Sequence, residues 1–245
     1  MFRIPQRNAG RALAWLTFLL LALGGVRLFE LVLHRPILTY GDNYDMIRIM
    51  PRFNLWPMEG TRGLNDFTTP LRQYVILDFG TDWCVYSSQM LLALPAAGMM
   101  AVVEHFRPGT IYDIRALGFS QAILLMFIAL FYSRRFLALG HPWAAVLNAA
   151  IFTFVVTDPV NTLYLSGFYT DASAIIFLYF SLAAGALYVV VGPTKARAAA
   201  IALGLLLLAT CKQQHLPTGL IVGGCVFIAG YVRWRRFPLG LTVSL

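Results

Sequence analysis

The chain has 245 residues, of which 59% are hydrophobic and only 12% charged, and its formal net charge is +8 at pH 7. An average soluble domain carries about 25% charged residues, so the composition excludes an ordinary soluble domain. In a soluble protein, this positive charge would indicate a nucleic-acid partner. Here the basic residues flank apolar segments, as they do when they orient a membrane protein, and no nucleic-acid partner is expected.

The first apolar segment covers residues 12–33 and follows Arg3, Arg7 and Arg11. It is long enough to cross the hydrocarbon core of a bilayer as a helix. It is too long for a removable signal peptide and lacks a small-residue cleavage site. We therefore predict a first membrane span with the N-terminus in the cytoplasm. Further apolar segments follow at 86–104, 116–133, 142–157, 171–191, 198–210 and 217–232.

The basic clusters decide which of these seven segments cross the membrane. If all crossed, the clusters near residues 134, 195 and 233 would lie outside, against the positive-inside rule. Treating 86–104 as a helix that lies in the interface, or re-enters it, returns every cluster to the cytoplasm. This segment also contains the helix-weakening run Leu-Pro-Ala-Ala-Gly. The inside segments then hold ten Arg or Lys residues and no acid, whereas all eleven acids lie outside or toward the outer helix ends.

The sequence thus predicts an all-α, polytopic transmembrane helix bundle with six spans, in the inner or plasma membrane. Residues 1–245 form a single transmembrane domain, and a continuous outer segment of about 34–115 carries the interfacial helix. The sequence includes no soluble domain. It stops shortly after Arg-Trp-Arg-Arg and a proline, and we expect it to be a truncated piece of a longer protein.

The outer segment opens with a pair of acids. Asp42 and Asp45 are three residues apart, so a helix beginning at Asp42 would present both on one face. In one interpretation they cap and solvate an interfacial helix. In the other, a carboxylate at the membrane surface acts as a general base toward an acceptor hydroxyl or amine.

A second acidic segment, 158–171, joins two predicted spans on the outer side and contains no cation. Asp171 begins the helix 171–191, where the helix dipole favours an acid. Capping alone would explain Asp171, but not the aromatic cluster of Tyr164, Phe168 and Tyr169 just before it. Anchoring of aromatic rings in the membrane interface is one explanation of the cluster.

The third outer feature is the segment 209–217, which contains Lys212, one of two lysines in the chain. An outer lysine departs from the positive-inside rule. It either extends its ammonium group to the surface without further role or binds a lipid-linked phosphate as a point charge. Gln213, Gln214 and His215 would add neutral hydrogen bonds, and no metal is expected because His215 lacks partners at metal-ligand spacing. Outer arginines, Arg115 among them, are further phosphate candidates.

This arrangement resembles the GT-C superfamily of integral-membrane glycosyltransferases, and most closely the pattern of protein O-mannosyltransferases and lipid A aminoarabinose transferases. In that pattern an Asp-Glu pair follows the first span. Gly41-Asp42-Asn43-Tyr44 stands at this position, with Asn43 in place of the glutamate. The resemblance implies that Asp42 is the catalytic base and leaves the role of the second carboxylate open, with Asp45 as one candidate.

The other matches are short and cover most of the chain as topology. In chain order they are Phe67-Thr68-Thr69-Pro70-Leu71 before the interfacial helix, 86–104 as that helix, Tyr112-Asp113-Ile114-Arg115 at the start of the second span, Ser166–Asp171 as the second acidic loop, and Thr210-Cys211-Lys212 as a lysine motif with an inserted cysteine.

The resemblance implies an inverting transfer of a sugar from a polyprenyl-phosphate or polyprenyl-pyrophosphate donor to a lipid, glycan or protein acceptor on the extracytoplasmic face. Asp42, Asp45 and Asp171 are the catalytic candidates, and Lys212, Arg115 and Gln213 the donor-phosphate candidates. Some relatives bind a divalent metal through acidic loops, so a metal stays open. A transporter or flippase of lipid-linked saccharides, or a non-catalytic membrane subunit, is the alternative. The charges at the outer boundary rather than in mid-span favour the enzyme.

Overall fold

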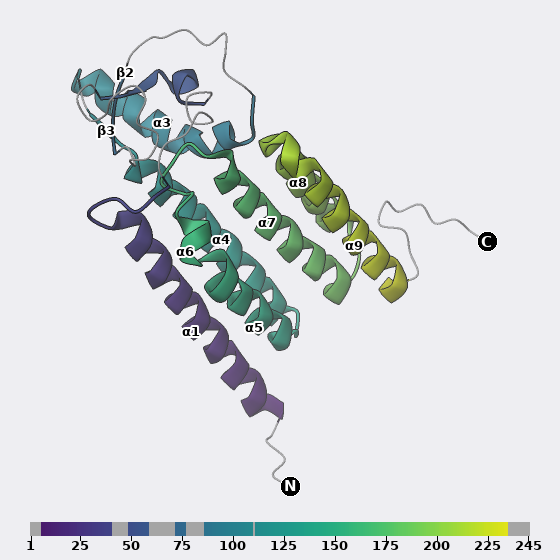
Figure 1. Cartoon of the computed structure of the whole chain (residues 1–245). Helices are drawn as coiled ribbons and strands as arrows, with labels where there is room; N and C mark the ends of the chain where they lie inside the picture. The colour runs from purple at the N-terminus through teal and green to yellow at the C-terminus, as the bar shows by residue number, and fades with distance from the viewer. Residues whose placement is uncertain (1–5, 41–48, 59–71, 77–85, 110, 235–245) are drawn as a thin grey trace. The chain divides into compact units, whose positions relative to one another are not determined.

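The computed structural model describes residues 6–40, 49–58, 72–76, 86–109 and 111–234. Within these ranges the chain is a polytopic, predominantly helical membrane protein (Figure 1). It divides into two compact units. We call Met1–Val26, Leu125–Thr157 and Ala174–Leu245 the bundle unit, and Arg27–Leu124 with Asp158–Ser173 the loop unit.

The helices expected from the apolar segments are confirmed. They are α1 (Gln6–Leu33), α3 (Gln89–Phe106), α4 (Arg115–Ala138), α5 (Pro142–Ile151), α7 (Thr170–Val191), α8 (Lys195–Cys211) and α9 (Leu216–Trp234). A π-helical turn, Phe152–Val156, extends α5, and a short helix α6 (Pro159–Thr162) follows it. The ends agree with the predicted segments to within a few residues, except that α1 begins earlier and α4 ends later.

Five helices in the described part of the chain are long and apolar enough to cross a membrane: Ala9–Leu33, Gln89–Phe106, Arg115–Ala138, Thr170–Val191 and Gln213–Trp234. The apolar helix Pro142–Val156 is shorter, and α8 has 17 residues. This set differs from the six predicted spans in three helices: α3 is added because it has 18 residues, whereas Pro142–Val156 and α8 are shorter than that. Both sets describe a multi-pass protein.

Polar side chains inside the bundle unit satisfy one another. The Asn148 amide on α5 donates to Ser133 Oγ at 2.9 Å and to the Ala129 carbonyl at 3.3 Å, both on α4. Its Oδ1 accepts a hydrogen bond from the Tyr179 hydroxyl of α7 at 3.3 Å. This network links α4, α5 and α7. Its hydrogen bonds offset the free-energy cost of burying the Asn148 amide.

The loop unit contains a small antiparallel sheet that the sequence did not predict. Its strands are β1 (Leu55–Pro57), β2 (Gln73–Ile76) and β3 (Tyr112–Asp113), in the order β1-β2-β3. Leu55 pairs with Ile76, and Tyr74 with Tyr112. A 3-10 turn, Met50–Phe53, precedes β1. The strands are too short to give the alternation by which a strand is normally recognised.

Helix α3 packs along this sheet. Its residues Ala93, Ala96 and Met100 belong to one buried cluster with Leu55, Tyr74 and Tyr112, which come from the three strands. Figure 1 shows α3 beside β2 and β3. An open sheet leaves unpaired backbone groups at its edges, and such edges do not face lipid within the hydrocarbon core. The interfacial position of α3, which the charge pattern favours, stays a prediction, because α3 is also long and apolar enough to cross a membrane.

Candidate functional site

Four of the six residues singled out from the sequence lie in the described part of the chain. Asp171 and Arg115 belong to the loop unit, and Lys212 and Gln213 to the bundle unit. The predicted carboxylates Asp42 and Asp45 lie outside the described residues. What the structure does describe is the chain on either side of them.

The residues that lead into the first acidic loop are attached to the second. Thr39 Oγ1 donates a hydrogen bond to the Leu163 carbonyl at 2.8 Å, and the Tyr40 hydroxyl donates to the Val160 carbonyl at 3.0 Å. The Tyr40 ring lies against the Tyr164 ring, with 4.4 Å between centroids. The segment that ends two residues before Asp42 is thus held on the loop that precedes Asp171.

The chain returns from the first acidic loop to the same place. Ile49 and Met50 are fully buried, in one cluster with Phe168 and Tyr169 of the second loop. Tyr169 also lies 6.3 Å from the Tyr40 ring, between centroids. The aromatic residues that capping could not explain therefore form the packing surface on which both ends of the segment 41–48 are anchored.

The two acids of the second loop have different surroundings. Asp158 caps α6, because its side chain accepts a hydrogen bond from the Val160 amide at 3.0 Å. It also faces Arg27 at 3.6 Å, in a pair that is partly exposed on both sides. Asp171 lies in the first turn of α7 and is half-buried. The position agrees with the expected dipole effect, while Asp158 supplies the cap and the ion pair.

Asp113 organises two arginines at the start of α4. Its carboxylate accepts hydrogen bonds from Arg72 Nε at 2.9 Å and from Arg115 Nε at 3.0 Å, and it also pairs with Arg115 Nη2. Burial alone would raise the pKa of Asp113, but the hydrogen bonds from Arg115 and Arg72 outweigh it and hold that pKa below the ordinary 3.8. The ionised group of three carries one net positive charge. Asp113 thus fixes the direction of Arg115, whose side chain is only 13% exposed.

In the sequence, the motif Tyr112-Asp113-Ile114-Arg115 indicates only its arginine as a candidate residue. The Asp-x-Arg spacing across the strand-to-helix junction is the signal that points to this pair. Burial, with a smaller effect of the Asp113 carboxylate, raises the pKa of Tyr112, which therefore keeps its proton at physiological pH.

The loop unit also contains buried polar groups without a hydrogen-bond partner. They include both amide atoms of Gln121 on α4 and the hydroxyls of Ser166 and Thr170. Ser166 packs directly on α4 at Gly118, where a Cβ would lie 2.4 Å from Ser166 Oγ. Gln121 is one turn further along α4. Unpaired buried groups are uncommon and mark a place where water or a hydroxyl-bearing ligand would be held.

In the bundle unit, Lys212 and Gln213 form the turn between two antiparallel helices. Lys212 is the residue after α8 and caps the 3-10 turn Gln213–His215, from which α9 begins. Lys212 is half-buried and Gln213 exposed. Within the described ranges, no group of three or more His, Cys, Asp or Glu side chains could hold a metal ion. The described residues therefore do not by themselves make a metal site.

The model of the family described as YfdI N-terminal transmembrane domain matches residues 7–243, nearly the whole chain. No curated protein and no solved structure matches the sequence.

Proposed function

The chain belongs to the family of YfdI N-terminal transmembrane domains, and we propose that it transfers a sugar from a polyprenyl-phosphate or polyprenyl-pyrophosphate donor to an acceptor on the extracytoplasmic membrane face. The main support is the attachment of Thr39 and Tyr40 to the second acidic loop. These hydrogen bonds hold together two acidic segments that are far apart in the chain.

In the proposed reaction Asp42 is the general base. It takes the proton of the acceptor hydroxyl as the acceptor oxygen forms a bond to the anomeric carbon. The bond from that carbon to the phosphate oxygen breaks, and the configuration inverts. Asp42 follows Tyr40 by two residues in the chain, and its own position lies outside the described residues. Asp45 and Asp171 are the proposed additional carboxylates.

The leaving phosphate needs positive charge as the bond breaks. Arg115 is the candidate in the loop unit, where Asp113 holds its guanidinium in one orientation and Arg72 adds a second cation. Lys212 and Gln213 are the candidates in the bundle unit.

A transporter of lipid-linked saccharides is less well supported. Transporters place functional polar groups near the middle of the bilayer. In the described part of the bundle unit, the side-chain amide of Asn148 forms hydrogen bonds with Ser133, Ala129 and Tyr179. This is a structural role.

The test uses the full-length protein in proteoliposomes, a panel of radiolabelled polyprenyl-phosphate hexoses, and envelope lipids and glycans as acceptors. We expect Asp42→Asn to lower the transfer rate by at least about 100-fold, the contribution of a general base. Asp158→Asn is the matched control, because asparagine still caps α6 and the lost pair is exposed. Wild-type transfer by Asp42→Asn would refute the base assignment. Movement of the donor across the bilayer without transfer would establish the transporter instead.

A further inference from the structure

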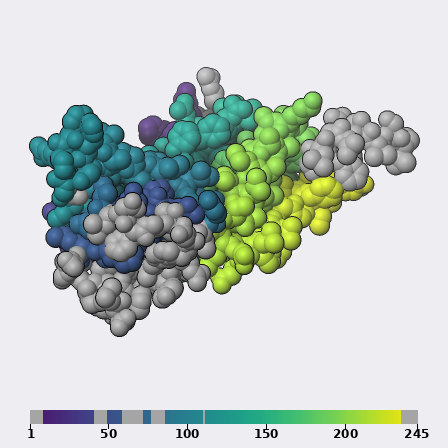
Figure 2. All heavy atoms as spheres, turned by 90° about the horizontal axis from the view of Figure 1, so that it is seen from above, coloured from purple at the N-terminus to yellow at the C-terminus, as the bar shows by residue number. Residues whose placement is uncertain are grey.

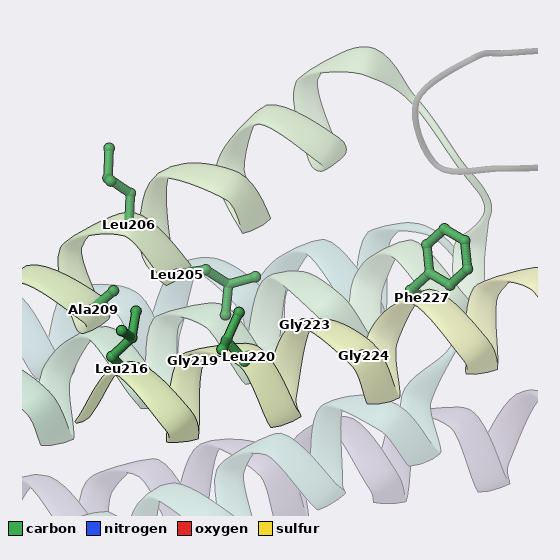
Figure 3. A pocket seen from close by; sticks show the side chains of 9 residues that line it. All are labelled: Leu205, Leu206, Ala209, Leu216, Gly219, Leu220, Gly223, Gly224 and Phe227. Atoms are coloured by element: carbon green, nitrogen blue, oxygen red, sulfur yellow. The ribbon is translucent and has the colours of Figure 1, made fainter. Parts of the chain in front are cut away.

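An apolar groove runs along the antiparallel pair α8 and α9. These helices are adjacent at the molecular surface in Figure 2, in yellow-green and yellow. The groove has a volume of about 490 Å³, within the range of small-molecule sites. Figure 3 shows side chains of both helices along it, from Leu206 and Leu216 to Phe227. Leu206 and Leu220 are 61% and 70% exposed, so its walls face the lipid.

Three of the groove residues are glycines, at 219, 223 and 224. A Cβ at Gly223 would lie 3.1 Å from Leu205 Cδ1, so this glycine lets α9 approach α8 closely. A Cβ at Gly219 would lie 3.6 Å from the Leu205 carbonyl oxygen, which is an ordinary van der Waals contact. Gly224 differs, because a Cβ there would meet no described atom within 4 Å. It is the open part of the groove.

One end of the groove is polar. Lys212 and Gln213 lie in the turn between Ala209 and Leu216, the groove residues on either side of that turn. From Leu216 to Phe227 the groove follows α9 for about 16 Å at the rise of an α-helix. This is roughly half of the 30 Å hydrocarbon core, the depth of one leaflet. A cation above an apolar groove of one-leaflet depth fits an amphiphile with an anionic head and an apolar tail.

We infer that this groove binds the polyprenyl tail of a lipid phosphate, with the phosphate at Lys212. This inference rests on the proposed function, which requires a polyprenyl-linked donor. It places the polyprenyl chain of that donor along α8 and α9. The charge at Lys212 favours a phosphate head. Leu206, Leu216 and Leu220 are 61%, 50% and 70% exposed, and they offer an apolar surface that suits an apolar chain.

The experiment measures binding to the full-length protein in nanodiscs with two probes. One is a polyprenyl phosphate with a photoreactive group in its tail, and the other is dimethylallyl phosphate, which is too short to reach Gly224. Gly224→Leu should fill the groove without disturbing α8, and Gly224→Ala is its control. We expect Gly224→Leu to lower the affinity for polyprenyl phosphate at least about tenfold and to leave the affinity for dimethylallyl phosphate unchanged. Lys212→Ala should lower the affinity for both probes, and Lys212→Arg should restore it.

Photo-crosslinks of the tail to α8 and α9 would support the assignment. It would be overturned by unchanged polyprenyl affinity in Gly224→Leu, by equal competition from ordinary phospholipid, or by crosslinks between two copies of the protein through this face. The proposed transfer is judged separately. If the tail binds in the groove but no sugar is transferred, the transferase proposal fails and the lipid site stands. If transfer proceeds equally in Gly224→Leu, the groove assignment fails and the transferase proposal stands.

Discussion

The ring of Tyr40 lies 4.4 Å from the ring of Tyr164, between centroids, and its hydroxyl donates to the carbonyl of Val160 at 3.0 Å. Tyr40 is the last described residue before the first acidic loop, and Tyr164 belongs to the second. Tyr40 thus provides both a ring contact, with the ring planes tilted by 41°, and a hydrogen bond to the second acidic loop.

Replacing Tyr40 should separate positioning from folding. We expect Tyr40→Ala to lower the transfer rate at least about tenfold, because misplacing a reacting group is costly. Tyr40→Phe keeps the ring and loses one hydrogen bond, so its rate should stay within about threefold, a loss of the order of one hydrogen bond. Rates are measured in proteoliposomes at matched protein content. Equal rates in Tyr40→Ala and the wild type would show that the ring contact does not position the first loop.

The Asp113 cluster predicts a defined pH dependence of stability. The folded pKa of Asp113 lies below its ordinary 3.8, so its ion pairs stabilise the fold above that value. The stabilisation is lost as the pH falls through the lower folded pKa. We expect Asp113→Asn to lower the melting temperature in detergent at neutral pH, and the difference from the wild type to shrink in acid. Arg72→Gln, which removes the more exposed partner, should have the smaller effect. A difference that is constant from neutral pH into acid would contradict the ion-pair account.

Gly118 is a position where the loop unit has no room for a side chain. A Cβ there would lie 2.4 Å from Ser166 Oγ and 3.0 Å from Val32 Cγ1. We expect Gly118→Val to destabilise the protein by about 1–3 kcal/mol, as overpacking does. Gly98→Ala in α3 is the matched control, since a Cβ there meets no described atom within 4 Å and alanine favours a helix by about 0.5–1 kcal/mol. Reversible unfolding in mixed detergent gives both values. Equal stability of Gly118→Val and the wild type would contradict the close approach.

The Asn148 network should matter for stability but not for transfer. Asn148→Leu leaves Ser133 and Tyr179 without their partner, and we expect a loss of about 0.6–2 kcal/mol, the range for hydrogen bonds between membrane helices. The donor affinity and transfer rate of the remaining folded protein should be unchanged. A selective loss of donor movement or transfer, with stability intact, would give the network a functional role.

Cysteine labelling tests whether α3 lies at the outer surface. In a chain whose native cysteines at positions 84, 211 and 225 have been replaced, we expect His105→Cys to react with a membrane-impermeant maleimide in intact cells. Arg134→Cys, in a predicted cytoplasmic cluster, should react only after permeabilisation. If His105→Cys also required permeabilisation, α3 would be a membrane span and the outer segment would be divided.

The sequence predicts the helices because long apolar runs and flanking charges are strong local signals. It does not predict the sheet, whose strands of two to four residues are set by contacts with α3 and with Phe168. It identified Asp171 and the tyrosines as a cluster but not their attachment to Tyr40, since pairing of distant segments leaves no local pattern. It names Arg115 without Asp113, because the short strand β3, from which Asp113 reaches Arg115, was not predicted.

Thr39 and Tyr40 hold the second loop by the main-chain carbonyls of Leu163 and Val160. Every amino acid provides a carbonyl, so evolution is free to replace the side chains at 160 and 163 while the attachment persists. The side chains at 39 and 40 have no such freedom, because the two hydrogen bonds require a hydroxyl at 39 and a phenol at 40. Homologues are therefore expected to vary more at positions 160 and 163 than at Thr39 and Tyr40.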